Sequence, residues 1–160
     1  MLSRYNIKKI VIVKESKKHP IGIMSLKDMI KFVISDKTDR DLHEILICEA
    51  MTKNLIIANK NSAIIGCAKT VTENNVSSLI IVNEDDDINS LVGIITTTDF
   101  ANFFSENCVG LTSVENYMSQ PVFTISIKEK ISTAAQIMLE KKCPDLWLLT
   151  RMIIKIIWQA

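Results

Sequence analysis

The sequence predicts an α/β protein assembled from repeated units of strand, helix, strand, strand and helix. Two observations predict this fold class: the sequence repeats itself internally, and each repeat alternates short apolar runs with apolar stripes at helical spacing. The chain has 160 residues, of which 48% are apolar and 23% are charged. This is the composition of an ordinary globular protein.

Three blocks in register define the repeat. Residues 6–13 match residues 75–82 at an offset of 69, and residues 22–28 match residues 93–99 at an offset of 71. The two-residue difference falls in the polar stretch between the blocks, where a hairpin loop tolerates insertion. A third match without gaps relates residues 51–73 to residues 118–140 at an offset of 67.

These matches divide the chain into five parts. They are the C-terminal half of a repeat (1–35), a linker (36–48), a complete repeat (49–106), the N-terminal half of a third repeat (114–142) and a divergent tail (143–160). The sequence leaves open whether the complete repeat pairs with the first half or with the third. Half-repeats would leave apolar strands such as Val122–Ile125 without their usual neighbours. Exposed edges favour association, so we expect a homo-oligomer.

The complete repeat shows the expected order of elements. Leu55–Ala58 is a short apolar run that predicts a strand, and Asn61 or Ser62 is expected to cap the helix that follows. Leu79–Val82 is apolar throughout, which predicts a strand buried on both faces. The remaining elements are an acidic turn at 84–87, a partner strand at Leu91–Ile95 and a closing helix from Thr98 onward.

The tail departs from the repeat pattern at Cys143. If residues 143–155 are given A/T-rich codons and read from the third base of the Cys143 codon, one choice yields a strand and hairpin turn of the expected form. A frameshift is therefore one interpretation of the tail. The other is a divergent helix, Leu146–Trp158, that covers a sheet edge or mediates assembly.

The repeat resembles the CBS repeat, named after cystathionine-β-synthase, over Ser3 to about Lys142. The resemblance rests on Met51-Thr52, Leu55–Ala58, Leu79–Val82 and Gly93-x-x-Thr96-x-x-Asp99 in register, repeated within the chain. It implies units packed as Bateman-type pairs that bind AMP, ADP, ATP or S-adenosylmethionine in clefts between the units. It also implies that binding regulates an attached or partner protein, here an unknown effector.

The Gly93-x-x-Thr96-x-x-Asp99 block is predicted to lie where a strand ends and a helix begins. A glycine permits close approach of a ligand to the backbone, and the Thr96 hydroxyl with the free N–H groups can hold a phosphate oxygen. Asp99 accepts hydrogen bonds only, which suits two ribose hydroxyls. The alternative is that these residues are an N-cap and a first-turn acid. The matching residues of the first repeat are Gly22, Ser25 and Asp28.

The two predicted sites differ in charge. Lys8 and Lys9 precede a strand of the first repeat, where Ser77 and Ser78 stand in the second. The resemblance implies that basic residues at these positions contact phosphate, so we expect the first site to prefer the more charged ligand. Because side chains alternate along a strand, only one lysine can point inward; we expect this to be Lys9, with Lys8 solvated.

Two apolar positions, Ile7 and Val76, either pack on the adenine or belong to the core. The run Asp85–Asp87 is expected to be a solvated turn and not a metal site.

The remaining composition argues against other classes of protein. A net charge of +1 predicts no binding to nucleic acid or membrane. The four cysteines form no C-x-x-C pair, so no metal or cofactor is expected, and free thiols indicate the cytoplasm. No catalytic constellation is present in the sequence, so we expect a regulatory binding module and not an enzyme. The alternative function is a structural dimerisation module without ligand.

Overall fold

The computed structural model describes residues 8–14, 19–38, 40–85, 89–106 and 112–140. Contacts between Cα atoms divide the chain into two compact units. Unit 1 takes residues 1–12, 22–52 and 123–160, and unit 2 takes residues 13–21 and 53–122. Mixed sheets and helices of this kind confirm the predicted α/β class.

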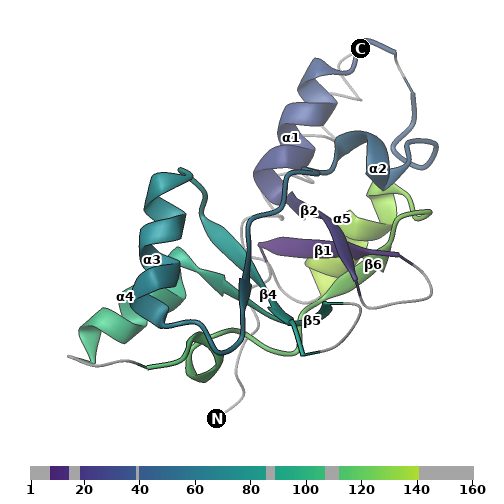
Figure 1. The fold of residues 1–160 in the computed structure, drawn as a ribbon. Helices are drawn as coiled ribbons and strands as arrows, with labels where there is room; N and C mark the ends of the chain where they lie inside the picture. Colours follow the sequence, from purple (N-terminus) through teal and green to yellow (C-terminus); the bar gives the residue numbers. More distant parts are fainter. Residues whose placement is uncertain (1–7, 15–18, 39, 86–88, 107–111, 141–160) are drawn as a thin grey trace. The chain divides into compact units, whose positions relative to one another are not determined.

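Unit 2 contains the complete repeat from residue 53 onward, whereas residues 49–52 belong to unit 1. The strand order of unit 2 is β3-β4-β5, in which β4 is parallel to β3 and antiparallel to β5. Figure 1 labels β4 and β5 of this sheet together with α3 and α4. The order along the chain is strand, helix, strand, strand, helix, as the sequence predicts. The elements are β3 (Ile57–Asn59), α3 (Ile64–Glu73), β4 (Ser78–Asn83), β5 (Ser90–Thr96), α4 (Thr97–Ser105) and the 3-10 helix η1 (Val114–Asn116).

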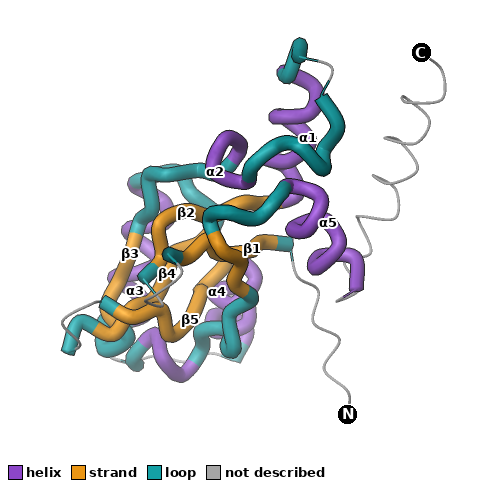
Figure 2. The backbone as a smooth tube through the Cα atoms, turned by 90° about the vertical axis from the view of Figure 1, so that its right-hand side faces the viewer, coloured by secondary structure: helices purple, strands orange, loops and turns teal. Residues whose placement is uncertain are grey.

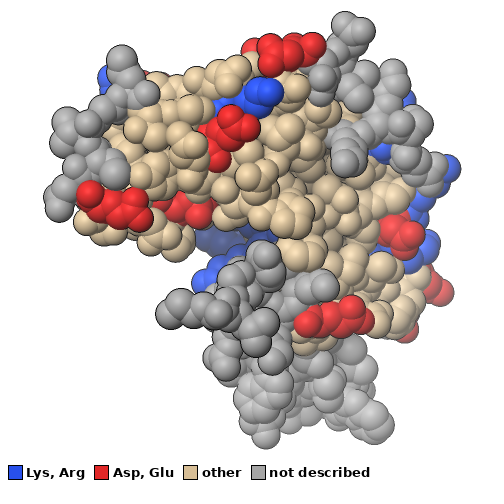
Figure 3. All heavy atoms as spheres, turned by 90° about the horizontal axis from the view of Figure 1, so that it is seen from below, with Lys and Arg blue, Asp and Glu red and all other residues tan. Residues whose placement is uncertain are grey.

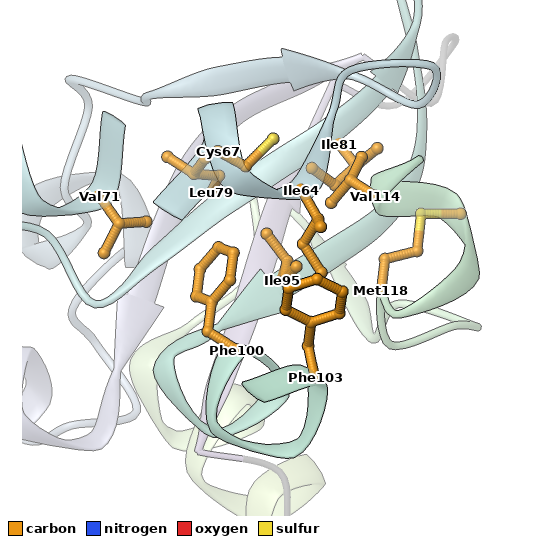
Figure 4. Close-up of a cluster of buried hydrophobic side chains, with 10 residues drawn as sticks. All are labelled: Ile64, Cys67, Val71, Leu79, Ile81, Ile95, Phe100, Phe103, Val114 and Met118. Carbon is orange, nitrogen blue, oxygen red and sulfur yellow. The ribbon is translucent and has the colours of Figure 1, made fainter. Parts of the chain in front are cut away.

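The core of unit 2 lies between its sheet and its two longer helices. Helical spacing brings the apolar residues of α3 and α4 onto the faces that meet β4 and β5 (Figure 4). Burial of residues 79–82 confirms the prediction of a fully buried strand. The cluster consists of Ile64, Cys67, Val71, Leu79, Ile81, Ile95, Phe100, Phe103, Val114 and Met118.

The start of α3 differs from the expected cap. The N-cap residue is Ala63, and neither Asn61 nor Ser62 caps the helix. Instead, the Ile64 N–H donates a 2.9 Å hydrogen bond to the carbonyl of Thr112. A backbone acceptor from a distant segment thus satisfies an amide that a polar side chain was expected to satisfy.

Unit 1 combines segments of the first half-repeat with segments of the third. Its strand order is β2-β1-β6, and Figure 2 shows β1 and β2 as neighbouring strands. The prediction that Val122–Ile125 lacks a neighbour is wrong, because the Val11 N–H donates to the Phe123 carbonyl at 3.0 Å and β6 adjoins β1. The elements are β1 (Lys9–Val13), β2 (Pro20–Ser25), α1 (Leu26–Ser35), α2 (Ile47–Ala50), β6 (Thr124–Ser126) and α5 (Ile131–Glu140).

The two units repeat the same backbone joints. In unit 1 the Ile47 N–H donates to the Glu129 carbonyl, and in unit 2 the Val114 N–H donates to the Ser62 carbonyl, both at 2.9 Å. These pairs are related by the 67-residue offset of the sequence. The first repeat is therefore completed by β6 and α5 of the third repeat. In the complete repeat, β3 and α3 occupy the corresponding places.

The surface carries charges of both signs. On the face shown in Figure 3, most described atoms belong to uncharged residues, with acidic and basic side chains both present. No helix in the described part of the chain is both long and apolar enough to cross a membrane. Asp85 is exposed, as expected of a solvated turn, and Lys60 Nζ lies 3.5 Å from its carboxylate. Asp86, Asp87 and the tail from Cys143 lie outside the described residues.

Candidate functional site

The candidate site recurs at the strand–helix junction of each unit. In unit 1, β2 ends at Ser25 and α1 begins at the next residue. In unit 2, β5 ends at Thr96 and α4 begins at the next residue. The hydroxyl and the carboxyl predicted from the sequence therefore lie at the first turn of a helix in both units.

In unit 1 the hydroxyl and the carboxyl are hydrogen bonded to each other. Asp28 Oδ2 accepts from the Ser25 N–H at 2.9 Å and from Ser25 Oγ at 2.6 Å. Ser25 Oγ in turn accepts from the Asp28 N–H at 3.2 Å. This is the capping box of the alternative interpretation, and it also orients both side chains at one half-buried point of the surface.

Unit 2 repeats this arrangement with one addition. Asp99 Oδ2 accepts from the Thr96 N–H and from Thr96 Oγ1, both at 2.7 Å. The other carboxylate oxygen, Oδ1, accepts from Ser119 Oγ at 3.3 Å. The last bond is long, so a ligand hydroxyl in better geometry would compete with it readily.

The two glycines are close to methionine side chains. A Cβ added to Gly22 would overlap Sδ of Met51, and a Cβ added to Gly93 would overlap Sδ of Met118. The space above each glycine is therefore filled by the methionine that opens the following repeat. In this structure, close packing of methionine accounts for the glycines without a ligand.

The basic residues distinguish the two units. Lys8 is exposed and Lys9 is half-buried, and Ser77 and Ser78 differ in the same way. Burial lowers the pKa of Lys9 below the ordinary lysine value, and the negative charge of Asp28 offsets part of this effect. Lys9 thus lies close enough to Asp28 for their charges to interact, and Ser78 is its uncharged counterpart.

The two apolar candidates have different outcomes. Val76 is partly buried and packs against the core cluster of unit 2, in agreement with the core alternative. Ile7 lies outside the described residues. Among the residues that the structure describes, no group of three or more His, Cys, Asp or Glu side chains could hold a metal ion.

A pocket of about 480 Å³ opens beside Asp99 in unit 2. Its volume lies in the range of small-molecule sites, about 300–1,000 Å³. Apart from Asp99, sequence reasoning did not identify the lining residues, which are Asn102, Glu106, Thr112, Asn116 and Tyr117. Helical spacing could have found Asn102 and Glu106, which follow Asp99 by three and seven residues; the others come from the segment around η1.

The fold and part of the sequence are shared with known proteins. The family model described as the CBS domain matches residues 43–106. The uncharacterised protein MJ1232 of Methanocaldococcus jannaschii is 34% identical over 85 residues, which make up 53% of this chain. The chain spans only 25% of the length of that relative.

Solved structures of CBS-domain proteins share the fold. The CBS domain pair of protein MJ0100, in complex with 5′-methylthioadenosine and S-adenosylmethionine, is 28% identical with a TM-score of 0.54, covering 66% of this chain and 76% of that one. The CBS domain protein PAE2072 of Pyrobaculum aerophilum, complexed with AMP, is 14% identical with a TM-score of 0.55, covering 60% and 72%. At this lower identity the likeness extends to the fold alone.

Proposed function

Because the chain is a member of the CBS-domain family, we propose that it is a regulatory module that senses an adenosyl compound. The ligand would bind at the Ser25–Asp28 pair of unit 1 and at the Thr96–Asp99 pair of unit 2. One observation carries the proposal: both units hold a hydroxyl and a carboxylate together at the same strand–helix junction. Such a pair offers acceptors to ribose hydroxyls, and the helix N–H groups offer donors to a phosphate.

The ligand class draws support from the relative with the higher identity. The CBS domain pair that binds 5′-methylthioadenosine and S-adenosylmethionine is 28% identical to this chain. We propose that this chain also takes an adenosyl compound, with AMP, ADP and ATP as the other members of the class.

The two sites are proposed to have unequal ligand preferences. Lys9 is half-buried and lies near Asp28, so its ammonium group can pair with a phosphate in unit 1. Ser78 at the matching position of unit 2 offers no charge. Unit 1 would therefore favour a phosphorylated ligand, and unit 2 a ligand with less negative charge.

The test is a calorimetric titration of Asp28→Ala and Asp99→Ala with adenosine, 5′-methylthioadenosine, AMP and S-adenosylmethionine. Each loss of a hydrogen bond to a charged group costs about 1.5–3 kcal/mol, so each variant should weaken its own site roughly tenfold or more. Glu73→Ala, an exposed acid at the end of α3, is the matched control. Unchanged affinity in both aspartate variants, with melting curves that show them folded, would contradict the proposal.

Lys9 offers a second and independent test of the unit 1 site. Lys9→Ala should weaken AMP about tenfold and leave adenosine unchanged, because only AMP carries the phosphate. Lys8→Ala should change neither ligand, because Lys8 is exposed. Equal affinity for adenosine and AMP in the parent protein would reject the role of Lys9 in phosphate binding.

The capping hydrogen bonds favour a second candidate function. In both units Oδ2 of the aspartate already accepts two hydrogen bonds from the capping residue. A structural dimerisation module without ligand would need no more than this. A thermal-shift panel separates the two functions, because a ligand at a hundred times its dissociation constant adds about 2.7 kcal/mol of stability.

The output of the module is proposed to act on a partner protein and not through catalysis in this chain. Binding would shift the population of conformations that the partner recognises.

We also propose self-association, supported by large exposed apolar side chains such as Ile34, Ile65 and Phe104, at 74%, 40% and 56% exposure. A clean monomer by light scattering at micromolar concentration would contradict self-association. The free thiols of Cys48 and Cys67 support a proposed cytoplasmic location.

A further inference from the structure

A second pocket, of about 290 Å³, opens in unit 2 beside β3 and has a largely apolar wall. We call it the Ile57 pocket. Its wall combines buried side chains with one large apolar side chain that is 47% exposed, that of Ile57. The apolar lining residues are Pro20, Ile21, Leu55, Ile57 and Val82. A wall of this kind favours a ligand with an apolar body.

The polar side chains of the Ile57 pocket carry no negative charge. Those that the structure describes belong to His19, Lys53 and Asn89. Lys53 is exposed, and within the described part of the chain no acidic side chain forms an ion pair with it. A lysine ammonium and an asparagine amide both donate hydrogen bonds, so the polar edge of the pocket suits an anionic group.

The Ile57 pocket is separate from the two strand–helix junctions. Pro20 precedes Ser25 by five residues on β2, and Val82 follows Ser78 by four residues on β4. At about 3.3 Å per residue, these separations correspond to about 13–17 Å along a strand. Neither hydroxyl–carboxylate pair contributes to the described lining. A ligand in this pocket would therefore contact side chains that the junctions do not use.

The repeat itself does not require the residues that give this pocket its character. The 67-residue offset places Gln120 at the position that matches Lys53, and Thr124 at the position that matches Ile57. The backbone of the repeat thus forms with a neutral polar residue at both positions. The lysine and the exposed isoleucine are features of one pocket and not of the scaffold.

We propose that the Ile57 pocket binds a small organic carboxylate, with the apolar body of the ligand against Ile57 and Val82 and its carboxylate group at Lys53. The apolar body would remove the exposed side chain of Ile57 from water, which is favourable. The carboxylate would accept a charge-assisted hydrogen bond from the Lys53 ammonium group. This site is additional to the proposed adenosyl sites and does not depend on them.

The experiment is an NMR titration of the full chain with hexanoate, followed through the backbone amide signals of β3 and of Lys53. Acetate has the charge without the chain, and 1-hexanol has the chain without the charge, so both should bind more weakly than hexanoate. Shortening hexanoate to butanoate should weaken binding by up to about fourfold for each methylene removed, because each buried methylene contributes to affinity.

Two variants separate the charge from the apolar wall. Lys53→Gln should weaken hexanoate roughly two- to fivefold and leave 1-hexanol unchanged, since exposed charge pairs have small energies. Ile57→Thr should weaken both probes, because each loses the same apolar contact. Each variant introduces the residue of the matched position, which the repeat fold accommodates. Lys69→Gln, at an exposed lysine of α3 outside the described lining, is the matched control and should change neither probe.

The outcomes distinguish this inference from the proposed function. Displacement of hexanoate by adenosine would place the Ile57 pocket within the adenosyl site and overturn the inference. Absence of hexanoate binding at millimolar concentration, or an equal response to Lys53→Gln and Lys69→Gln, would overturn it as well. Hexanoate binding that depends on Lys53 and Ile57, in a chain that binds neither adenosine nor AMP, would support the inference and contradict only the proposed function.

Discussion

Unit 1 and unit 2 have the same three-stranded sheet but take it from the chain in different ways. Unit 2 takes all three strands from residues 57–96, whereas unit 1 takes two from residues 9–25 and the third from residues 124–126. Matching joints nevertheless close both units, such as Leu46 with Lys130 and Ala63 with Ser113. The comparison shows that the same sheet forms from the matching segments of the repeat, although these segments follow one another in a different order along the chain in the two units.

The two units are alike as scaffolds and different as sites. The hydroxyl–carboxylate pair at the strand–helix junction is the same in both. The surroundings differ, because Lys9 of unit 1 is replaced by Ser78 of unit 2. The two repeats thus share the local backbone geometry and differ in the charge beside it.

The largest expected difference between the units concerns core phenylalanines at matched positions. Phe103 is fully buried, so Phe103→Ala should lower the free energy of unfolding by about 3–5 kcal/mol. Phe32 occupies the matched position of α1 but is half-buried, so Phe32→Ala should lower it by less. Urea unfolding followed by circular dichroism measures both. Equal losses would show that the two cores are equally packed.

A second comparison concerns the glycine–methionine contacts. Gly93→Ala should lower the free energy of unfolding by about 1–3 kcal/mol, because the new Cβ overlaps Met118. Gly22→Ala should have a smaller effect, because Met51 is less buried than Met118 and can move aside. Combining Gly93→Ala with Met118→Ala should lower stability by less than the sum of the single changes. Strict additivity in thermal unfolding would argue against the contact.

A third comparison concerns the N-cap residues of α1 and α4 and tests whether the two units are equivalent. Ser25→Ala and Thr96→Ala each remove a hydroxyl bonded to the helix-starting aspartate, and each should lower the free energy of unfolding by about 0.5–2 kcal/mol. Melting temperatures of the two variants should therefore fall by similar amounts. A change confined to one unit would mean that only one junction is a structural cap.

The smallest expected effect is a pH dependence specific to unit 1. The pKa of Lys9 is lowered in the folded state by burial, so the charged lysine destabilises the fold at pH 7. At pH values between the lowered pKa and the ordinary lysine pKa, the unfolded chain binds more protons at Lys9 than the folded protein does. The contribution of Lys9 to the free energy of unfolding therefore rises with pH over this range. Lys9→Met should therefore raise the melting temperature at pH 7 and give a smaller gain at pH 10.

The matched control for that pH effect is Lys8→Met. Lys8 precedes Lys9 and is exposed, so its replacement should leave the melting temperature unchanged at both pH values. A gain of the same size from both variants would mean that overall charge, and not burial of Lys9, is responsible.

Sequence reasoning succeeded where the signal is local. The offset between repeats and the spacing of Ser25 and Asp28 predict the strand–helix junction, because a helix begins within a few residues of its cap. The buried strand at 79–82 follows from its unbroken apolar run.

Features that depend on distant segments could not be predicted in this way. Pairing of β6 with β1 joins residues more than a hundred positions apart, and no local pattern encodes it. The cap expected at Asn61 or Ser62 is absent because Thr112 supplies the acceptor for Ile64. Tyr117 lines the pocket from the segment around η1, and helical spacing along α4 cannot predict a residue of another segment.

The divided origin of unit 1 has a consequence for synthesis on the ribosome. Residues 53–119 contain every strand and helix of the sheet and core of unit 2, so this unit can close as soon as they emerge. Strands β1 and β2 emerge earlier but must wait for β6 and α5, and closing so long a loop slows folding. Over that interval β1 and β2, which are synthesised first, lack their neighbouring strand β6, so the apolar side chains of these strands stay exposed.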